Sequence, residues 1–395
     1  MSSRERARAL VLHATSVPVG WPRVLADTVR NRTPNALNRL LQPLRRWRYL
    51  RFYLGDEYER LSYVPDWRDA WAAAPGLSVD LCDINDLWAT ARARRRIPGY
   101  ELIVVLHSAA GDNLSRARAL EPLLQRRKAP LVIFFGNEYV RMPEKIAFTR
   151  SVEAEYIASQ LPSDAAAWLY ADCRSHILHA PAALNAAVYR PLGLPRGVDL
   201  GFRGDVYQHA YALGDVDRTR VLELFRQSAA GLGLTVDIEY QRVNRNDWNL
   251  LLNRWHGVVG AESGARFLER DDRTRSAVVA FLQDNPAATW EDVQRRFFAD
   301  GASAVSGKAI SSRHFEPAGT GTCQVLVEGR YNDILRPGEH YISLRRDHSN
   351  LDEVVAAFKD TGYRRRIADQ HRELVMVAHT YAHRVEAVLK AVLAA

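Results

Sequence analysis

The chain has 395 residues, of which 47% are hydrophobic and 25% charged, and these ordinary globular values exclude wholesale disorder and fibrous repeats. A single hydrophobic core rarely grows beyond ~250–300 residues, so we expect two domains. Lys and Arg exceed Asp and Glu by 54 to 46, and the resulting charge of +8 favours anionic partners: nucleic acid, acidic glycan, a phosphate-bearing cofactor or a membrane surface.

The first half of the chain alternates short apolar runs with helical stretches. A helix is predicted over 115–127, where apolar residues recur at helical spacing. Strands are predicted over 9–13, 77–82, 101–107, 130–135, 166–170 and 176–179. Strands that alternate with helices are typical of parallel β-α-β units. We therefore expect a Rossmann-like N-terminal domain over 1–190.

The same alternation restarts after residues 189–195, which contain two prolines and are interpreted as a linker. Predicted strands and helices then alternate over 198–203, 218–232, 235–240, 246–254 and 257–261. They indicate a second Rossmann-like domain over 191–365. Two helical patterns, 274–282 and 290–299, predict a helical insertion at about 271–307, and Thr289 with Asp292 forms a variant of the capping box. A long helix over about 366–395 ends the chain.

The three cysteines, Cys82, Cys173 and Cys323, are far apart and contain no Cys-x-x-Cys pair. They predict neither a disulfide framework nor a cysteine-based zinc site, and they favour a reducing cytoplasm. The longest apolar runs fall well short of the ~20 residues that a membrane helix needs. The first nine residues lack the apolar run of a signal peptide, so we expect a cytoplasmic protein.

The most informative stretch is S-S-R-H-F-E-P-A-G-T-G-T-C-Q-V-L, residues 311–326. Glycine lets a ligand approach the backbone, and a helix N-terminus offers N–H donors to phosphate. The carboxylate of Glu316 can accept the two hydroxyls of a ribose, and the fork-shaped guanidinium of Arg313 suits a phosphate. The pattern predicts a nucleotide diphosphate site, with an ordinary turn capped by a solvated glutamate as the alternative.

Residues 315–326, F-E-P-A-G-T-G-T-C-Q-V-L, resemble the F-E-A-x-A-x-G-T-x-x-V/L signature of group 1 glycosyltransferases. The run 325–354 resembles the spore-maturation-type members, which carry E-G-x-Y…I-L…H-Y-I-x-L…D-x-S-N. The similarity covers about 255–385. It implies the α/β fold called GT-B, in which two Rossmann-like domains face each other across a deep cleft. The N-terminal domain would hold the acceptor and the C-terminal domain the donor, with the last helix crossing back to the first domain.

The resemblance also implies residues that bind the donor. Glu316 matches the glutamate that binds the nucleotide ribose, and Arg313 matches the arginine of the S-P-R-x-F-E pattern. Gly321 and Thr322 match a helix start that faces the diphosphate, with Thr320 beside them. His340 and Tyr341 lie in the H-Y-I-x-L stretch. Arg203, in the glycine-containing loop 201–205, is a further candidate for the diphosphate, as are Arg218 and Arg220.

One departure from the family pattern leaves two alternatives. Retaining relatives carry a second glutamate eight residues before the ribose glutamate, where this chain has Lys308. Lys308 could itself meet the phosphates as a point charge. Alternatively, Glu262, which follows the predicted strand 257–261, takes the place of the lost glutamate at the donor sugar. Whether the reaction inverts or retains the anomeric configuration therefore stays open.

Candidates for the acceptor side lie at strand ends of the first half, where ligands of open α/β sheets bind. His107 is the first choice as general base because histidine titrates near neutral pH, and the alternative is a histidine that only hydrogen-bonds a loop. The other candidates are His13, Asp112, Glu138 and, in the loop after the first strand, Gly20 and Trp21.

We therefore expect a metal-independent glycosyltransferase that uses a nucleotide-diphosphate sugar, UDP-linked for example, as co-substrate and needs no other cofactor. The acceptor would be a glycan, a lipid-linked molecule or a small molecule, as in cell-envelope or secondary-metabolite synthesis. The basic, aromatic stretch 35–54 could contact a membrane surface peripherally. The alternatives are a non-catalytic sugar- or nucleotide-binding protein on the same fold and, because of the charge, a nucleic-acid-binding protein, although no nucleic-acid recognition motif is present.

Overall fold

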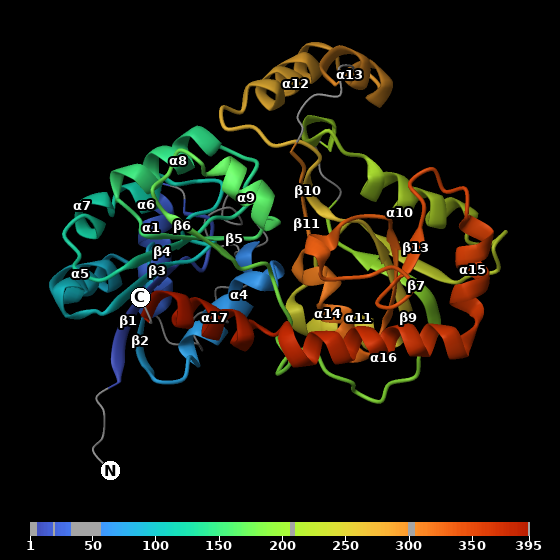
Figure 1. The fold of residues 1–395 in the computed structure, drawn as a ribbon, viewed down its shortest axis with the longest axis horizontal. Coiled ribbons are helices and arrows are strands. Elements are labelled where there is room, and N and C mark those ends of the chain that lie inside the picture. The colour runs from blue at the N-terminus through green and yellow to red at the C-terminus, as the bar shows by residue number, and fades with distance from the viewer. Residues whose placement is uncertain (1–5, 19, 33–56, 206–209, 299–304, 394–395) are drawn as a thin grey trace. The chain divides into compact units, whose positions relative to one another are not determined.

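The computed structural model describes residues 6–18, 20–32, 57–205, 210–298 and 305–393 (Figure 1). The chain divides into two compact units. The first comprises Met1–Ser159, Tyr170–Leu178 and Val385–Ala395, and the second Gln160–Leu169 and His179–Arg384. The basic stretch 35–54 lies outside the described residues. Within the described ranges, no helix has the length and apolar character needed to cross a membrane.

The first unit is built on a sheet that has, within the described residues, six strands in the order β2-β1-β3-β4-β5-β6. The four pairings from β2 to β5 are parallel. Every residue of β3 and β4 is buried, as expected for parallel strands covered on both faces. The strands are β1 (Ala7–His13), β2 (Leu77–Asp83), β3 (Leu102–Val105), β4 (Leu131–Phe134), β5 (Tyr156–Ser159) and β6 (His176–His179).

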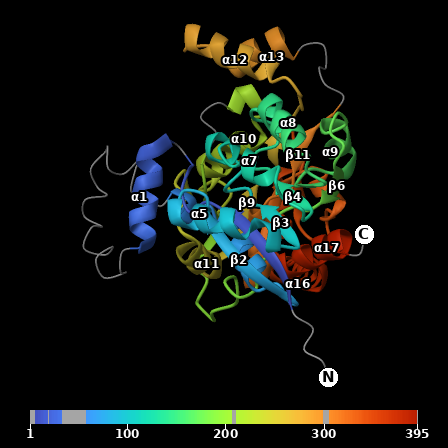
Figure 2. The ribbon, with the colours of Figure 1, turned by 90° about the vertical axis from the view of Figure 1, so that its left-hand side faces the viewer.

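Helices connect the strands of this sheet, and α1 and α5 lie side by side (Figure 2). The side chain of Asp86 caps α5 by accepting the N–H groups of Trp88 and Ala89. The helices are α1 (Gly20–Arg32), η2 (Glu57–Arg60), α4 (Tyr63–Ala72), α5 (Leu87–Arg96), η3 (Ile97–Gly99), α6 (Ser115–Arg118), α7 (Glu121–Leu124) and α8 (Met142–Ser151).

The second unit contains a parallel sheet with the strand order β13-β12-β9-β7-β8 among its described residues. A short antiparallel pair, β10 with β11, lies outside that sheet. The strands are β7 (Val198–Arg203), β8 (Val236–Glu239), β9 (Trp255–Gly260), β10 (Ser263–Ala265), β11 (Gly307–Ala309), β12 (Cys323–Val327) and β13 (Ile342–Leu344). Both sheets confirm the predicted α/β class.

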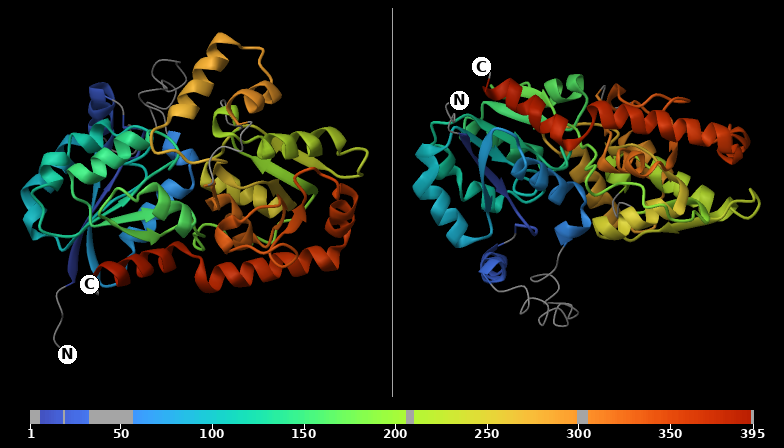
Figure 3. Two further views of the ribbon diagram at one scale, coloured as in Figure 1. Left: turned by 45° about the horizontal axis from the view of Figure 1, so that its top comes forward. Right: turned by 90° about the horizontal axis from the view of Figure 1, so that it is seen from below.

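The helices of the second unit cover both faces of its sheet, and α16 runs beside α14 and β12 (Figure 1). The helices α12 and α13 project away from the sheet (Figure 3). The helices are α9 (Ser163–Leu169), η4 (Ala210–Leu213), α10 (Asp217–Ser228), α11 (Arg245–Arg254), α12 (Arg273–Asp284), α13 (Trp290–Phe297), η5 (Ser312–His314), α14 (Glu316–Thr320), η6 (Tyr331–Asp333), α15 (Leu351–Lys359), α16 (Thr361–Ala378) and α17 (Tyr381–Leu393), the last divided between the units at Val385.

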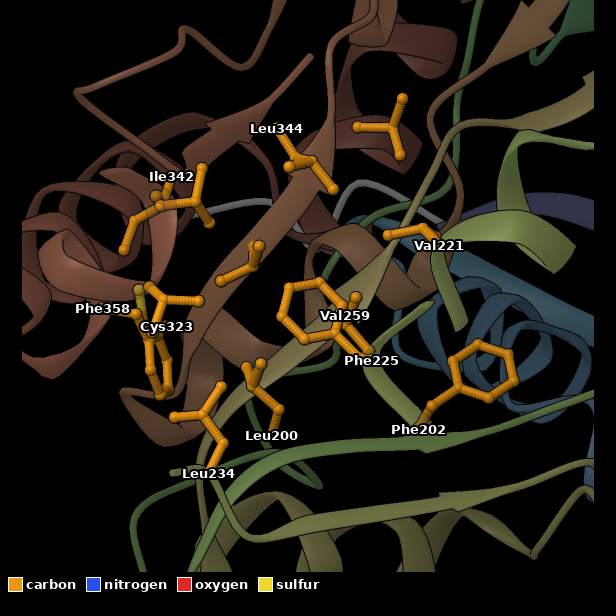
Figure 4. Close-up of a cluster of buried hydrophobic side chains, with 14 of the residues drawn as sticks. Leu200, Phe202, Val221, Phe225, Leu234, Val259, Cys323, Ile342, Leu344 and Phe358 are labelled. Atoms are coloured by element: carbon orange, nitrogen blue, oxygen red, sulfur yellow. The ribbon is translucent and has the colours of Figure 1, made fainter. Parts of the chain in front are cut away.

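One core of the second unit lies between its sheet and the helices α10 and α15 (Figure 4). Leu200 and Val259 from the central strands pack with Phe225 of α10 and Phe358 of α15. Burial of each such side chain contributes about 1.5–3 kcal/mol, so this apolar contact holds the carboxyl ends of the strands in place.

Several predicted elements are confirmed and three are wrong. The strand over 198–203 and the capping box of Thr289 are present as predicted. Residues 166–170 are wrong as a strand because most of them belong to α9. The helix predicted over 115–127 is two short helices, since Pro122 cannot donate within a helix interior. The single C-terminal helix is interrupted at 379–380, where the backbone pairs with Leu184 instead.

We expect Gly201→Ala to destabilise the second unit. A Cβ atom at Gly201 would lie 2.1 Å from Cδ2 of Trp255, which is completely buried. Overpacking of this kind costs about 1–3 kcal/mol of the free energy of unfolding, measured by urea denaturation. Gly197→Ala is the matched control, because a Cβ there meets no atom within 4 Å. Equal stability of the two variants would contradict the packing argument.

Candidate functional site

The strand order of the second sheet places a ligand-binding position at the carboxyl ends of β7 and β9. In open parallel sheets ligands bind where the strand order reverses, and here that point lies between these two strands. Gly204 follows β7, and Glu262 follows β9. The segment 311–316 reaches the same edge: a Cβ on Gly204 would lie 3.6 Å from Cζ of Arg313, and His314 Nε2 lies 3.2 Å from the carbonyl oxygen of Ala261.

Arg313 holds its guanidinium between two aromatic rings at this edge. Its Cζ lies 4.7 Å from the ring centroid of Trp248 and 6.0 Å from that of Phe202. The residue is partly exposed, but its Nη1 is buried and has no hydrogen-bond acceptor within the described part of the chain. Burial lowers the pKa of Arg313 to about 10, against the opposing effect of Glu316. A partly desolvated cation with a buried donor atom that lacks an acceptor is a binding group for an anion.

Two further arginines lie near Arg313. Arg218 and Arg242 both lie close enough to lower the pKa of Arg313. Arg218 donates to Ser263 Oγ at 2.7 Å, and Arg242 pairs with Asp205 in the loop after β7. Asp205 compensates the charge of Arg242, so Arg218 is the one of the two that adds positive charge beside Arg313.

Glu316 is fully buried at the first position of α14, and its Oε2 accepts the indole N–H of Trp248 at 2.6 Å. This hydrogen bond fixes the carboxylate beside Arg313, whose guanidinium lies on the same indole ring. The structure therefore brings together the two residues that the sequence singled out for ribose and phosphate.

The predicted helix start at Gly321 and Thr322 is wrong. Helix α14 ends at Thr320, and Gly321 forms its C-cap with a φ of +67°, a left-handed conformation that glycine adopts without strain. Thr322 Oγ1 donates to Leu252 O at 2.7 Å and accepts Arg196 Nη1 at 2.9 Å, while Thr320 Oγ1 donates to Pro317 O at 3.1 Å. These three residues shape the turn into β12 and present no helix N-terminus to a phosphate.

Lys308 and Glu262, the two alternatives for the missing glutamate, lie next to each other. The pairing of β10 with β11 places Lys308 opposite Gly264, and Lys308 Nζ donates to Glu262 O at 3.2 Å. Lys308 is buried and forms an ion pair with Asp215. Its charge is therefore compensated within the protein, which weakens the first alternative.

The carboxylate of Glu262 stabilises a strained turn. Its Oε1 accepts the N–H of Tyr331 at 2.6 Å, and Tyr331, Asn332 and Asp333 all have positive φ angles of 46–59°. Such left-handed residues cost roughly 1–2 kcal/mol each, so their neighbours must hold them. Asn332 Oδ1 contributes by accepting the N–H of Ile310 at 2.8 Å. Burial raises the pKa of Glu262, against the Tyr331 hydrogen bond. A contact from Glu262 to a donor sugar stays a prediction.

Three other predicted donor residues have structural contacts. Arg203 is buried, donates to Asp237 at 2.7 Å and lies 5.3 Å from the ring centroid of Trp255. His340 Nδ1 accepts the N–H of Arg336 at 3.0 Å. Tyr341 is completely buried in the second unit's core, and burial raises its pKa to about 12. These contacts, rather than a ligand, account for the burial of all three side chains.

No role was predicted for His314, which links the segment 311–316 to the end of β9. Its Nδ1 accepts the N–H of Ser311 at 2.9 Å, so its Nε2 carries the proton donated to Ala261 O. Burial lowers the pKa of His314 to about 3, so the ring stays neutral. The only signal in the sequence is its place between Arg313 and Glu316, which says nothing about a partner some fifty residues earlier.

In the first unit, the prediction that His107 titrates near neutral pH is wrong. The ring lies 5.6 Å from Trp67, 5.2 Å from Phe134 and 6.1 Å from Tyr63, measured between centroids. Both nitrogens are buried without a hydrogen-bond partner among the described residues. Burial lowers the pKa of His107 to about 3, because a charged imidazole cannot be solvated in this aromatic cage.

The other acceptor-side candidates differ in accessibility. Glu138 is buried and accepts hydrogen bonds from Ser159 and Tyr170, both at 2.8 Å. His13 is buried at the end of β1, and burial lowers its pKa. Asp112 is exposed and accepts two contacts from Asn137 Nδ2 at 2.9 and 3.0 Å. Gly20 and Trp21 are exposed at the start of α1.

Comparisons with known proteins give one family match and several similar folds. Residues 289–390 match a family described as glycosyl transferase-like. No curated protein matches the chain. Among solved structures, the DNA-modifying β-glucosyltransferase of T4 phage is similar with a TM-score of 0.50 and 11% identity, over 98% of this chain and 99% of that one. HepE from Anabaena, solved with UDP and glucose, has a TM-score of 0.49 and 10% identity over 98% and 100%.

The likeness to the T4 enzyme establishes the architecture, and the chain has the GT-B fold that was expected. The family match over the C-terminal part points to the same class of protein.

We expect Glu262→Ala to destabilise the left-handed turn at Tyr331 and so to lower the free energy of unfolding. It leaves the buried N–H of Tyr331 without an acceptor, which costs about 1–3 kcal/mol. Glu262→Gln keeps an amide oxygen for that N–H and should stay within about 1 kcal/mol of the wild type. Urea unfolding measures both, and equal losses would show that the carboxylate does not hold the turn.

We expect His107→Phe to reduce the pH dependence of stability. Because the pKa of His107 is about 3 in the folded state and that of an unfolded histidine about 6.5, the unfolded chain binds more protons as pH falls below 6.5. The wild type should therefore lose about 1.4 kcal/mol per pH unit more than the variant between roughly pH 6 and 4. Trp67→Phe is the control, because it changes an aromatic neighbour of His107 but leaves the histidine in place, so its pH dependence should match that of the wild type. Parallel profiles for His107→Phe and wild type would contradict this account.

Proposed function

We propose that this protein transfers a sugar from a nucleotide-diphosphate donor to a hydroxyl or other nucleophile of an acceptor, and that the second unit holds the donor. The observation that carries the proposal is the guanidinium of Arg313. It lies between Trp248 and Phe202 with Nη1 buried, and it makes no ion pair within the described residues. Gly204 beside it has no side chain to exclude a ligand.

The donor would lie along the carboxyl edge of β7 and β9. Arg313, supported by Arg218, would bind the diphosphate, and Glu316 would accept the ribose hydroxyls. As the bond between sugar and diphosphate breaks, negative charge grows on the phosphate oxygens. Fixed cationic groups stabilise that charge without reorganising, which lowers the barrier. These side chains supply the charge that a divalent metal would otherwise provide, so we expect turnover without one.

On the acceptor side, Asp112 replaces His107 as the proposed general base. Among the first-unit candidates it is the side chain that combines a carboxylate with exposure to solvent. The proposed acceptor is a glycan, a lipid-linked molecule or a small molecule, and the proposed location is the cytoplasm.

The test is calorimetric binding of UDP, GDP, dTDP, ADP and CMP to the full chain. One diphosphate should bind selectively, and Arg313→Gln should weaken it about 10–100-fold, because charge-assisted hydrogen bonds contribute about 1.5–3 kcal/mol. Glu316→Gln should also weaken it. Arg226→Gln is the matched control, since Arg226 is an exposed arginine of the same unit paired with Glu223.

Two results would overturn the assignment: no diphosphate binds, or Arg313→Gln binds as well as the control. Hydrolysis of UDP-glucose, the substrate of the T4 enzyme, is the first turnover assay. Selective binding without hydrolysis or transfer of any tested donor would instead identify a non-catalytic nucleotide-binding protein.

A further inference from the structure

Helix α1 exposes a row of apolar side chains. Trp21, Leu25 and Val29 recur every four residues, so they lie on one face of the helix. Their side chains are 65%, 55% and 62% exposed, although residues of this size are usually buried in a core. The opposite face of α1, which carries Val24 and Asp27, is buried.

The neighbouring helix α5 extends this row. Trp88 at its start is 62% exposed, and the guanidinium of Arg32, from the end of α1, lies 4.9 Å from the centroid of its ring. Thr28 Oγ1 accepts the N–H of Leu87 at 3.1 Å and thereby joins the two helices (Figure 2). Trp21, Leu25, Val29 and Trp88 together form what we call the α1–α5 face.

Positive charge surrounds the α1–α5 face. Exposed arginines follow Trp88 along α5, and the helix contains no acidic residue. Arg96 pairs with Asp80, but four arginines form no ion pair with any described residue: Arg32, Arg92, Arg94 and Arg95. The nearby carboxylates are already used, since Asp27 pairs with Arg30 and Asp86 caps α5.

We propose that the α1–α5 face docks on an anionic lipid bilayer. Its tryptophan and aliphatic side chains would enter the interfacial region, and the arginines would bind lipid phosphates. Interfacial helices combine these features: an apolar stripe for the acyl boundary and cationic residues for anionic headgroups. A nucleic acid would use the arginines but offers no acyl chains to the exposed side chains of Leu25 and Val29, so the aliphatic residues favour lipid. The proposal does not depend on the donor site.

The test is sedimentation of the full chain with vesicles of phosphatidylcholine, with and without phosphatidylglycerol. We expect binding to the anionic vesicles, weakened when salt is raised from about 0.1 M to about 1 M, which shortens the Debye length from about 10 to about 3 Å. Arg92→Gln with Arg95→Gln should lower the partition coefficient about 25-fold, at about fivefold for each charge.

Leu25→Ser with Val29→Ser should lower the partition coefficient at least about tenfold, through the lost apolar burial. Val377→Ser and Arg226→Gln with Arg273→Gln are the controls, since they remove exposed apolar and basic side chains of the second unit. All these positions are exposed, and circular dichroism checks that each variant folds.

The proposal is overturned if the chain does not sediment with anionic vesicles, if it binds both vesicle types equally, or if the α1–α5 variants bind like the controls. Retention of a DNA duplex that the same variants abolish, without vesicle binding, would identify nucleic acid as the occupant. Self-association that Leu25→Ser with Val29→Ser abolishes, again without vesicle binding, would identify a second copy of the chain.

Discussion

The proposed donor site depends on the partial desolvation of Arg313. A guanidinium that is pressed between Trp248 and Phe202 loses water contacts, and its nearest carboxylate, Glu316, is itself hydrogen-bonded to Trp248. A cation in this position gains most from a ligand that brings its own negative charge. Gly204 belongs to the same packing, because a Cβ there would lie 2.9 Å from Cζ of Phe202 and 3.6 Å from Cζ of Arg313.

Sheet topology decides which parts of the sequence meet at this site. Gly204, Glu262 and Arg313 are separated by about fifty residues each. The neighbouring strands β7 and β9 bring Gly204 and Glu262 to one edge of the sheet, and η5 places Arg313 beside Gly204. The apolar runs predicted most of these strands, since buried parallel strands have a simple pattern. Two helix predictions failed because apolar spacing does not determine where a helix ends. Pro122 divides the helix predicted over 115–127, and backbone pairing with Leu184 interrupts the C-terminal helix.

The motif in the sequence predicted roles for Arg313 and Glu316, because both are close together in the chain and chemically distinctive, and these roles stay predictions. It missed Trp248 and His314, whose roles come from tertiary contacts. It misplaced Gly321 because a glycine can begin a helix or end one, and only the positive φ shows which. The prediction of a near-neutral pKa for His107 failed because the aromatic rings around it come from α4 and β4. Neither element is adjacent to His107 in the sequence.

The replacement of a family glutamate by Lys308 has a physical explanation in the β10–β11 pair. Lys308 is neutralised by Asp215 and donates to the backbone of Glu262, so it fixes the start of β10 rather than adding free charge to the site. The carboxylate of Glu262 then points to the turn at Tyr331, which in turn holds Ile310 through Asn332. A chain of polar contacts thus runs from Asp215 to the segment that carries Arg313. The lysine and the glutamate are parts of one scaffold, and Arg313 is the cation of this edge that has no ion pair among the described residues.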